Sequence, residues 1–329
     1  MRISRDALIK LAKDNVEKRF VRDPNVTAVF LVGSLRQENA VVESAADVDL
    51  LVLHNGELLR DREIVRLSNE YHLDIAYETV DLYSQPRELR GEGWRGWAMW
   101  DPVLLFQRGK FFEYTQSVVR SQFDEPVNII KRARCFADPA REAFVQLQLN
   151  PESATPLKLM DTAYKAGNAL ASLLGPPLPE RKFLAEFPAC ARQMDLTELV
   201  QILFSTISGN ISAEKIREKL PDWQEAFITA SKYPGDLRLH SARLAYYKTA
   251  IESQLESDFP RSALWPMLQT WALSANSGNF NEDQMDLWQR TCFEFGMSPE
   301  QMPERMQALD MLLENMEEIL EQVAADNGL

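Results

Sequence analysis

The sequence predicts an α+β protein in which a small mixed sheet is followed by an all-α helical bundle. Up to about residue 130, short apolar runs of strand character alternate with helical patterns. From about residue 131 onward the apolar residues recur at helical spacing, and no strand-like alternation returns. A chain of 329 residues is long enough for two domains with separate cores. We therefore expect two domains, residues 1–130 and 131–329.

The first domain is expected to open with a helix and to continue with strands. Leu8, Ala12, Val16 and Phe20 recur at the spacing of one helical face. The run 49–53 is almost wholly apolar, which is typical of a strand buried on both faces. The elements expected after the first helix are a strand at 26–32, a strand at 49–53, a helix at 62–69 and a strand at 72–80.

The second domain is expected to consist of packed helices. A strong amphipathic pattern covers 156–174 and is stopped by Gly175-Pro176-Pro177. The further helices expected are 195–207, 235–255, 260–274 and a last helix near the end of the sequence. This last helix carries apolar residues at 4-3-4-3 spacing, typical of a seam between paired helices: Leu309, Leu313, Met316, Leu320 and Val323. Its expected partner is another helix of the same bundle, with a dimer interface as the alternative.

The composition limits the classes of partner. The chain has 36 Lys and Arg against 49 Asp and Glu, a net charge of −13. Nucleic-acid-binding proteins need a basic surface to neutralise phosphates, and the densest basic patch here is the short segment 131–134, so a polynucleotide substrate is disfavoured. No apolar run approaches the ~18 residues of a membrane span. Residues 1–6 lack an apolar signal core.

The three cysteines indicate a reducing compartment. Cys135, Cys190 and Cys292 are odd in number and far apart. This pattern favours buried, reduced thiols in a cytoplasmic protein over a disulfide framework or a zinc site.

Three aspartates in the first domain have the spacing of a metal site. Asp47 and Asp49 lie one residue apart at the head of a predicted strand, so they face the same way, with Cα atoms roughly 6.6 Å apart. Asp74 opens another predicted strand and can reach the same ions from the side. A pair of Mg²⁺ ions in such sites is held about 3.5–4 Å apart. Because the set contains carboxylates and no His or Cys, we expect Mg²⁺ or Mn²⁺.

A Gly-Ser pair closes the apolar run that precedes these aspartates. The glycine of the pair, Gly33, allows the backbone to approach a phosphate closely. Exposed backbone N–H groups together with the Ser34 hydroxyl can then bind the terminal phosphates of a nucleotide.

The ordered set Gly33-Ser34, Asp47-Val48-Asp49 and Asp74 resembles the signature of the DNA polymerase β nucleotidyltransferase superfamily. The similarity is to its small bacterial members, such as the aminoglycoside nucleotidyltransferases, and it covers about the first 120 residues. The resemblance implies that Gly33 and Ser34 bind the triphosphate tail and that Asp47 and Asp49 hold both metals. It makes Asp74 the third carboxylate, acting as a metal ligand or as the base that takes the proton of the acceptor.

The resemblance also bears on three other segments. Residues 101–109 are similar to the strand and turn that close this domain in such proteins. Many relatives carry Ala-Arg-Gly soon after Gly-Ser, whereas this chain has Leu35–Asn39 without that glycine. Arg36 is our substitute candidate for a phosphate contact, with a surface arginine as the alternative. In relatives a helix of the second domain lends a lysine or an acid to the nucleotide and acceptor, which makes Lys165 a candidate. The alternative, which we favour, is a surface ion pair of Lys165 with Asp161.

Two further features leave alternatives open. Glu78 shares a strand face with Asp74 and is a second candidate for the base. Trp94, Trp97 and Trp100 form a cluster that either packs at the seam between the domains, which we favour, or stacks on a base or a sugar-like acceptor.

Together these features predict a metal-dependent nucleotidyltransferase. The expected reaction transfers a nucleoside monophosphate to a hydroxyl of a small-molecule acceptor, for example an aminoglycoside-like cation. The expected donor is ATP, which supplies AMP, or another nucleoside triphosphate. We expect the site in the cleft between the domains, where pockets usually form. The alternatives are a protein-adenylylating enzyme of the antitoxin type and a non-catalytic nucleotide-binding protein on the same scaffold.

Overall fold

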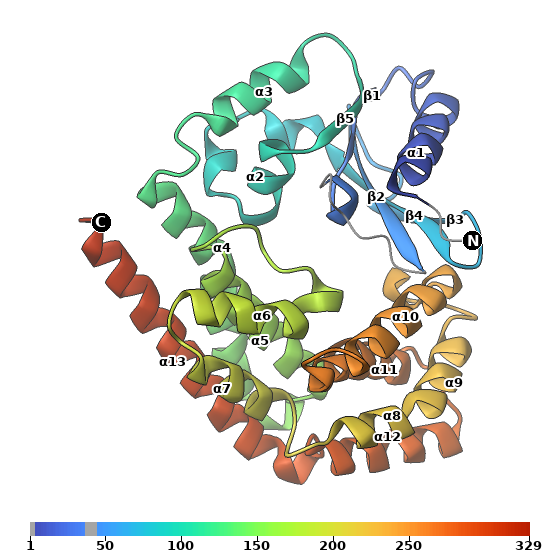
Figure 1. Cartoon of the computed structure of the whole chain (residues 1–329), viewed down its shortest axis with the longest axis vertical. Helices are drawn as coiled ribbons and strands as arrows, with labels where there is room; N and C mark the ends of the chain where they lie inside the picture. The colour runs from blue at the N-terminus through green and yellow to red at the C-terminus, as the bar shows by residue number, and fades with distance from the viewer. Residues whose placement is uncertain (1–3, 37–44) are drawn as a thin grey trace. The chain divides into compact units, whose positions relative to one another are not determined.

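The computed structural model describes residues 4–36 and 45–329 and divides into two compact units, Met1–Phe123 and Asp124–Leu329 (Figure 1). The first unit contains a five-stranded mixed sheet, and the described residues of the second form helices and turns without a strand. The expected α+β organisation is therefore confirmed. The division falls after Phe123 instead of at residue 130, because the first long helix of the second unit already begins at Pro126.

The sheet of the first unit has the strand order β3-β4-β2-β1-β5. The strands are β1 (Val26–Leu31), β2 (Ala46–His54), β3 (Arg62–Arg66), β4 (Tyr71–Thr79) and β5 (Val103–Gln107). β2 pairs with β4 in parallel, and the other neighbours are antiparallel. The strands expected at 26–32, 49–53 and 72–80 are thus present, and β5 lies within the expected segment 101–109.

Helices cover the two faces of the sheet with two separate cores (Figure 1). On one face lies α1 (Arg5–Arg19), whose Leu8, Ala12 and Val16 are buried against strand residues such as Val48 and Leu50. On the other face lie α2 (Gly93–Trp100) and α3 (Phe111–Arg120). Side chains alternate along a strand, so the neighbours of Val48 and Leu50 in β2 belong to this second face.

The helix expected at 62–69 is wrong, because Arg62–Arg66 forms β3. β3 and β4 make an antiparallel hairpin in which Ile64 lies opposite Asp74. The backbone N–H groups of Leu67 and Ser68 both donate to the carbonyl of Tyr71 and close the turn. Pairing with β4, which is not a local property of residues 62–69, therefore decides the structure of this segment.

The second unit is built from helices α4 to α13. Their bounds are α4 (Pro126–Leu149), α5 (Pro156–Ala171), α6 (Phe183–Gln193), α7 (Glu198–Ile207), α8 (Ala213–Glu218), α9 (Leu220–Ala230), α10 (Leu244–Leu255), α11 (Leu264–Asn276), α12 (Glu282–Phe295) and α13 (Met302–Asp326). The long α13 packs against α4, α5 and α7 of the same unit, as expected for the partner of its seam. Its seam residues from Leu309 to Leu320 are fully buried, and Val323 is half-buried.

The helix expected at 235–255 is shorter than predicted. Only Leu244–Leu255 is α-helical, and short 3₁₀ turns precede it. There the side chain of Asp236 accepts from the backbone N–H of Arg238 (2.8 Å), and that of His240 accepts from Ala242 (3.2 Å). Such local side-chain bonds compete with the helical pattern and favour a turn.

The cysteines are all free thiols, but only two of the three are buried. Burial raises the pKa of Cys190 to about 11 and that of Cys292 to about 12. Cys135 is exposed, contrary to expectation, because it lies on the outer face of α4. In the part of the chain that the structure describes, no helix combines the length and apolar composition needed to cross a membrane.

Candidate metal centre

The parallel pairing of β2 and β4 places the three aspartates side by side. Asp49 lies directly opposite Asp74, and Asp47 lies opposite His72. Asp47 and Asp49 are two residues apart on β2, so their side chains leave the same face of the sheet. The other face is the one that packs on α1. The three acids therefore occupy the sheet face opposite α1, in the interior of the sheet and not on an edge strand.

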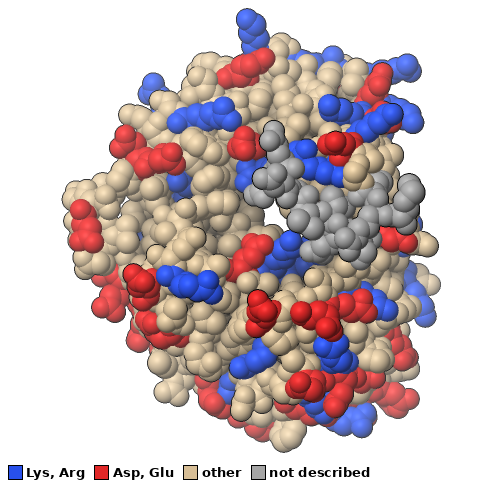
Figure 2. Space-filling view, viewed as in Figure 1, with Lys and Arg blue, Asp and Glu red and all other residues tan. Residues whose placement is uncertain are grey.

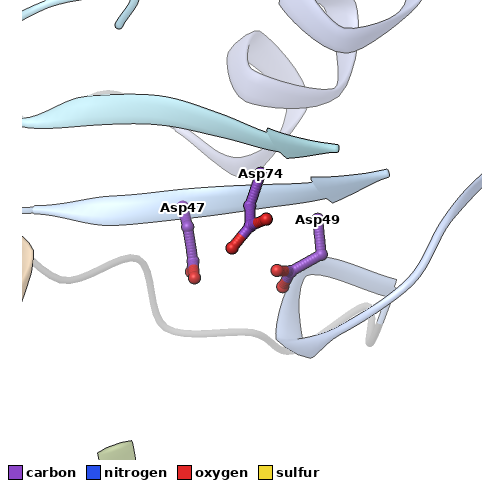
Figure 3. Close-up of side chains that lie close together, drawn as sticks. All are labelled: Asp47, Asp49 and Asp74. Carbon is purple, nitrogen blue, oxygen red and sulfur yellow. The ribbon is translucent and has the colours of Figure 1, made fainter. Parts of the chain in front are cut away.

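The carboxylates converge in space (Figure 3). One oxygen from each of Asp47, Asp49 and Asp74 can be chosen such that all three lie within 4.8 Å of one another. Asp47 is 9% exposed and Asp74 3%. Like charges at this distance, largely removed from water, repel and need a cation close by. Within residues 4–36 and 45–329, this is the group of three acid, His or Cys side chains that fits a metal ion.

Gly33 lies directly against this cluster. Its φ of +70° belongs to the left-handed region that favours glycine. A Cβ at this position would lie 2.0 Å from Oδ2 of Asp49, so the Asp49 carboxylate would have to shift to admit one. The N–H of Val32 donates to the carbonyl of Asp49 at 3.0 Å, which ties the bend to β2. The bend after β1 is thus hydrogen-bonded to the backbone of β2 at Asp49.

Ser34 and Arg36 form the short 3₁₀ turn that follows this glycine. Ser34 is exposed at the start of the turn. Arg36 donates to the backbone carbonyl of Asp101 at 3.2 Å and lies 4.0 Å from its carboxylate. Arg5 of α1 donates to the carbonyls of Leu35 and Arg36 at 2.8 and 3.1 Å. Arg36 therefore connects the turn to the start of β5, and a phosphate contact by this residue stays a prediction. Gln37 to Asn39 lie outside the described residues.

Arg62 is part of the site and was missed by sequence reasoning. Its Nε donates to Oδ1 of Asp74 at 2.6 Å, and its Nη2 donates to Oδ2 at 2.9 Å. This is a two-point guanidinium–carboxylate pair, the strong form of such contacts. The helix expected at 62–69 concealed it. Strand alternation would have put Arg62 and Ile64 on one face, the face of Asp74.

Glu78 has a different environment from Asp74. Both of its carboxylate oxygens accept from Nε of Arg95 at 3.2 Å, and it accepts a further hydrogen bond from the hydroxyl of Tyr83. Burial, reinforced by the charge of Glu78, raises the pKa of the Tyr83 phenol well above its ordinary value. Glu78 is thus held by Arg95 of α2 and by the phenol of Tyr83, and it is not part of the group of three acids.

The other candidates lie in local contacts of their own units. Nζ of Lys165 on α5 lies 2.7 Å from Oδ2 of Asp161, one helical turn away, in the surface ion pair given above as its alternative. A role of Lys165 in nucleotide binding stays a prediction. Trp97 and Trp100 pack on Phe123 with ring centroids 5.1 and 4.6 Å away, within the first unit.

Charges of both signs are mixed over the visible surface (Figure 2). On the face shown there, Lys and Arg alternate with Asp and Glu, and the described residues form no continuous basic stripe. A basic footprint of that kind is what polynucleotide binding requires. The exclusion of nucleic acid stays a prediction from the charge balance.

The donor set fits a hard divalent cation. Asp47, Asp49 and Asp74 offer only carboxylate oxygens, the ligands that Mg²⁺ and Mn²⁺ prefer. Three ligands from the protein leave positions for water and for phosphate oxygens, as in sites that act on nucleotides.

Comparison with protein-family models and with curated protein sequences finds no match. Among solved structures, the chain is similar to a crystal structure described as a nucleotidyltransferase-like protein from Exiguobacterium sibiricum 255-15. The two are 14% identical, the match covers 92% of this chain and 89% of that chain, and the TM-score is 0.28. A similarity at this level supports no inference about this chain.

Proposed function

We propose that the first unit carries a metal-dependent nucleotidyl-transfer centre. It transfers a nucleoside monophosphate, AMP when ATP is the donor, to a hydroxyl group of a small-molecule acceptor. The oxygen of the hydroxyl forms a bond to the α-phosphorus, the bond from the α-phosphorus to the bridging oxygen breaks, and pyrophosphate leaves. An aminoglycoside-like cation is one example of such an acceptor, in line with the acidic net charge of the chain.

One observation carries this proposal. Three carboxylates from two parallel strands converge within 4.8 Å, and a glycine bend lies so close to Asp49 that a Cβ on it would displace this carboxylate. A structural acid cluster does not need a backbone bend pressed against it. A phosphate-binding bend beside a metal site does, because the phosphates must reach both the ion and the backbone N–H groups.

The residues of this centre have distinct proposed roles. Asp47 and Asp49 hold the ions, and Gly33 and Ser34 bind the triphosphate tail. Asp74 is the third metal ligand and also accepts the proton of the acceptor hydroxyl. When bound, divalent ions neutralise charge on the α-phosphate and on the leaving pyrophosphate, and they align the in-line attack.

The test follows the label of radioactive ATP. With Mg²⁺ and a panel of hydroxyl acceptors that includes aminoglycosides, label from [α-³²P]ATP should appear on one acceptor, and label from [γ-³²P]ATP should appear in pyrophosphate. Asp49→Asn should abolish both signals. The control is Asp81→Asn, which removes the same charge from an exposed position outside the cluster and should leave turnover unchanged.

The outcomes separate the candidate functions. Label from [α-³²P]ATP on a protein instead of a small molecule would replace the acceptor class and keep the centre. Full turnover in the Asp49→Asn variant would contradict the centre itself. Binding of ATP without turnover on any acceptor would favour a non-catalytic nucleotide-binding protein.

A further inference from the structure

The contact between Arg62 and Asp74 uses both oxygens of one of the three acids. The guanidinium donates to Oδ1 at 2.6 Å and to Oδ2 at 2.9 Å, so neither oxygen of Asp74 is without a strong donor. Asp74 has a side chain that is 2% exposed, whereas that of Arg62 is 49% exposed. The fixed partner of this pair is therefore the acid, and the partner that can move into water is the arginine.

A divalent cation bound by Asp74 would meet this guanidinium at close range. A metal–carboxylate bond is ~2.1 Å long, so an ion on Asp74 and the guanidinium on the same carboxylate would lie only a few Å apart. Two cations at that distance repel, and the largely buried site gives little screening from water. Occupation of Asp74 by Arg62 and occupation by a metal ion therefore oppose each other.

We propose that Arg62 competes with the metal for Asp74 and sets the metal affinity of the centre. Without metal, the guanidinium compensates the charge of the buried carboxylate and keeps the acid cluster assembled. Metal binding displaces it toward solvent from its position on β3, which is an edge strand of the sheet. Arg62 is thus a positioning residue that acts through Asp74. This inference rests on the proposed metal centre and adds to it a residue outside the motifs from which the centre was predicted.

The experiment measures binding of Mn²⁺ alone to the full chain by isothermal titration calorimetry, without nucleotide. Arg62→Gln removes the competing cation, and we expect it to bind Mn²⁺ about tenfold more tightly than the unmodified chain, a change of ~1.4 kcal/mol. Arg62→Lys keeps the charge but loses the two-point contact. We therefore expect its Mn²⁺ affinity to rise about threefold, which is about half the free-energy change expected for Arg62→Gln.

The control is Arg60→Gln. Arg60 is also on the surface, with a side chain that is 58% exposed, and it pairs with Glu63 at 3.6 Å instead of with an acid of the cluster. The substitution removes the same charge near β3 and should leave the Mn²⁺ affinity within about twofold, because exposed charges are screened. A long-range charge effect would raise the affinity equally in both glutamine variants and would overturn the competition.

The remaining outcomes are decisive as well. Weaker or equal Mn²⁺ binding in Arg62→Gln, in a chain whose circular dichroism is unchanged, would mean that Arg62 supports the acids, and the competition would be wrong while the metal centre stands. If Arg62→Gln does not fold, Arg62→Lys decides by the same criterion. If the unmodified chain and both Arg62 variants bind no Mn²⁺, the metal centre fails and the competition fails with it.

Discussion

Asp74 and Glu78 lie on the same face of β4, four residues apart, but in different surroundings. Asp74 has two further carboxylates beside it and contacts the half-exposed Arg62. Glu78 contacts Arg95 and the phenol of Tyr83, and it does not belong to the group of three acids. Glu78 is the more exposed of the two, with a side chain 25% exposed against 2% for Asp74. Exposure therefore does not distinguish the candidate metal ligand from the other acid, whereas the neighbouring charged groups do.

This balance has a physical meaning. A carboxylate that pairs with one cation and accepts a hydrogen bond from one further donor has its charge neutralised. Such a group stabilises the folded state. Three carboxylates held within 4.8 Å of one another concentrate negative charge, which a bound cation can compensate. The charged groups around each acid thus distinguish Glu78, a structural acid, from Asp74, a candidate metal ligand on the same strand.

The largest effect is expected from exchanging the two acids for amides. Asp74→Asn should lower transfer by about 10³-fold or more, since several kcal/mol of transition-state stabilisation depends on the metals and the base. Glu78→Gln should keep the rate within about threefold, because its removal alters no group of the cluster. Initial rates of pyrophosphate release at saturating Mg²⁺ measure both. Equal losses in the two variants would break the distinction between the two acids.

A second comparison uses two glycines with positive φ. Gly33 (φ +70°) would place a Cβ 2.0 Å from Asp49, whereas Gly56 (φ +82°) has nothing within 4 Å of that position. Alanine at either site adds about 1–2 kcal/mol of backbone strain. Only Gly33→Ala should also lower the Mn²⁺ affinity, by about tenfold or more if Asp49 is displaced. Calorimetric titration alongside urea unfolding separates the two effects. An unchanged affinity in Gly33→Ala would show that the bend is not coupled to the cluster.

A third effect concerns stability at the Glu78 end. Glu78→Gln removes the charge that Arg95 and Tyr83 contact, although Glu92 stays 3.7 Å from Arg95. The substitution should therefore lower the free energy of unfolding by only about 1 kcal/mol, because the group is also partly exposed. Urea denaturation followed by circular dichroism measures this loss. A variant as stable as the unmodified chain would mean that the contacts of Glu78 contribute nothing.

The smallest effect is expected in the alkaline range. The pKa of Tyr83 is raised above its ordinary value of 10 by burial and by Glu78. The unfolded chain loses this proton near pH 10, whereas the folded chain retains it, so the contribution to stability is complete below pH 10 and falls as the pH rises further. In Tyr83→Phe the free energy of unfolding should therefore fall less steeply above pH 10.

Tyr77 provides a matched comparison for this titration. Burial and the hydrogen bond to Glu63 raise the pKa of Tyr77 to about 12, so the loss linked to Tyr77 should level off near pH 12. Unfolding curves at several pH values between 9 and 12 compare Tyr83→Phe, Tyr77→Phe and the unmodified chain. Identical slopes for all three would contradict both shifted pKa values.

Much of the fold and of the acid cluster could be predicted because the signals are local. The apolar runs of β1 and β2, the bend at Gly33 and the spacing of Asp47 and Asp49 each depend on a few adjacent residues. The convergence of Asp74 with Asp49 was an expectation that required the two strands to pair in parallel with one particular register, as they do.

What could not be predicted depends on pairing between distant segments. Residues 62–66 form a strand only because β4 offers them an antiparallel partner, and short apolar runs do not separate strand from helix. Because residues 62–69 were expected to form a helix, the contact of Arg62 with Asp74 could not be predicted. The partners of Glu78 were also inaccessible, because Arg95 reaches it from α2 across a tertiary contact that no spacing along the chain reveals.

The parallel pairing of β2 with β4 also governs when the acid cluster can exist during synthesis. β1 and β2 are adjacent in the sequence and can form their hairpin early, with Asp47 and Asp49 already in place. Asp74 joins them only after β3 and β4 have left the ribosome, since parallel strands require a crossover connection. A nascent chain that ends before β4 thus carries two of the acids without the third, and the complete cluster forms only when the sheet has closed around it.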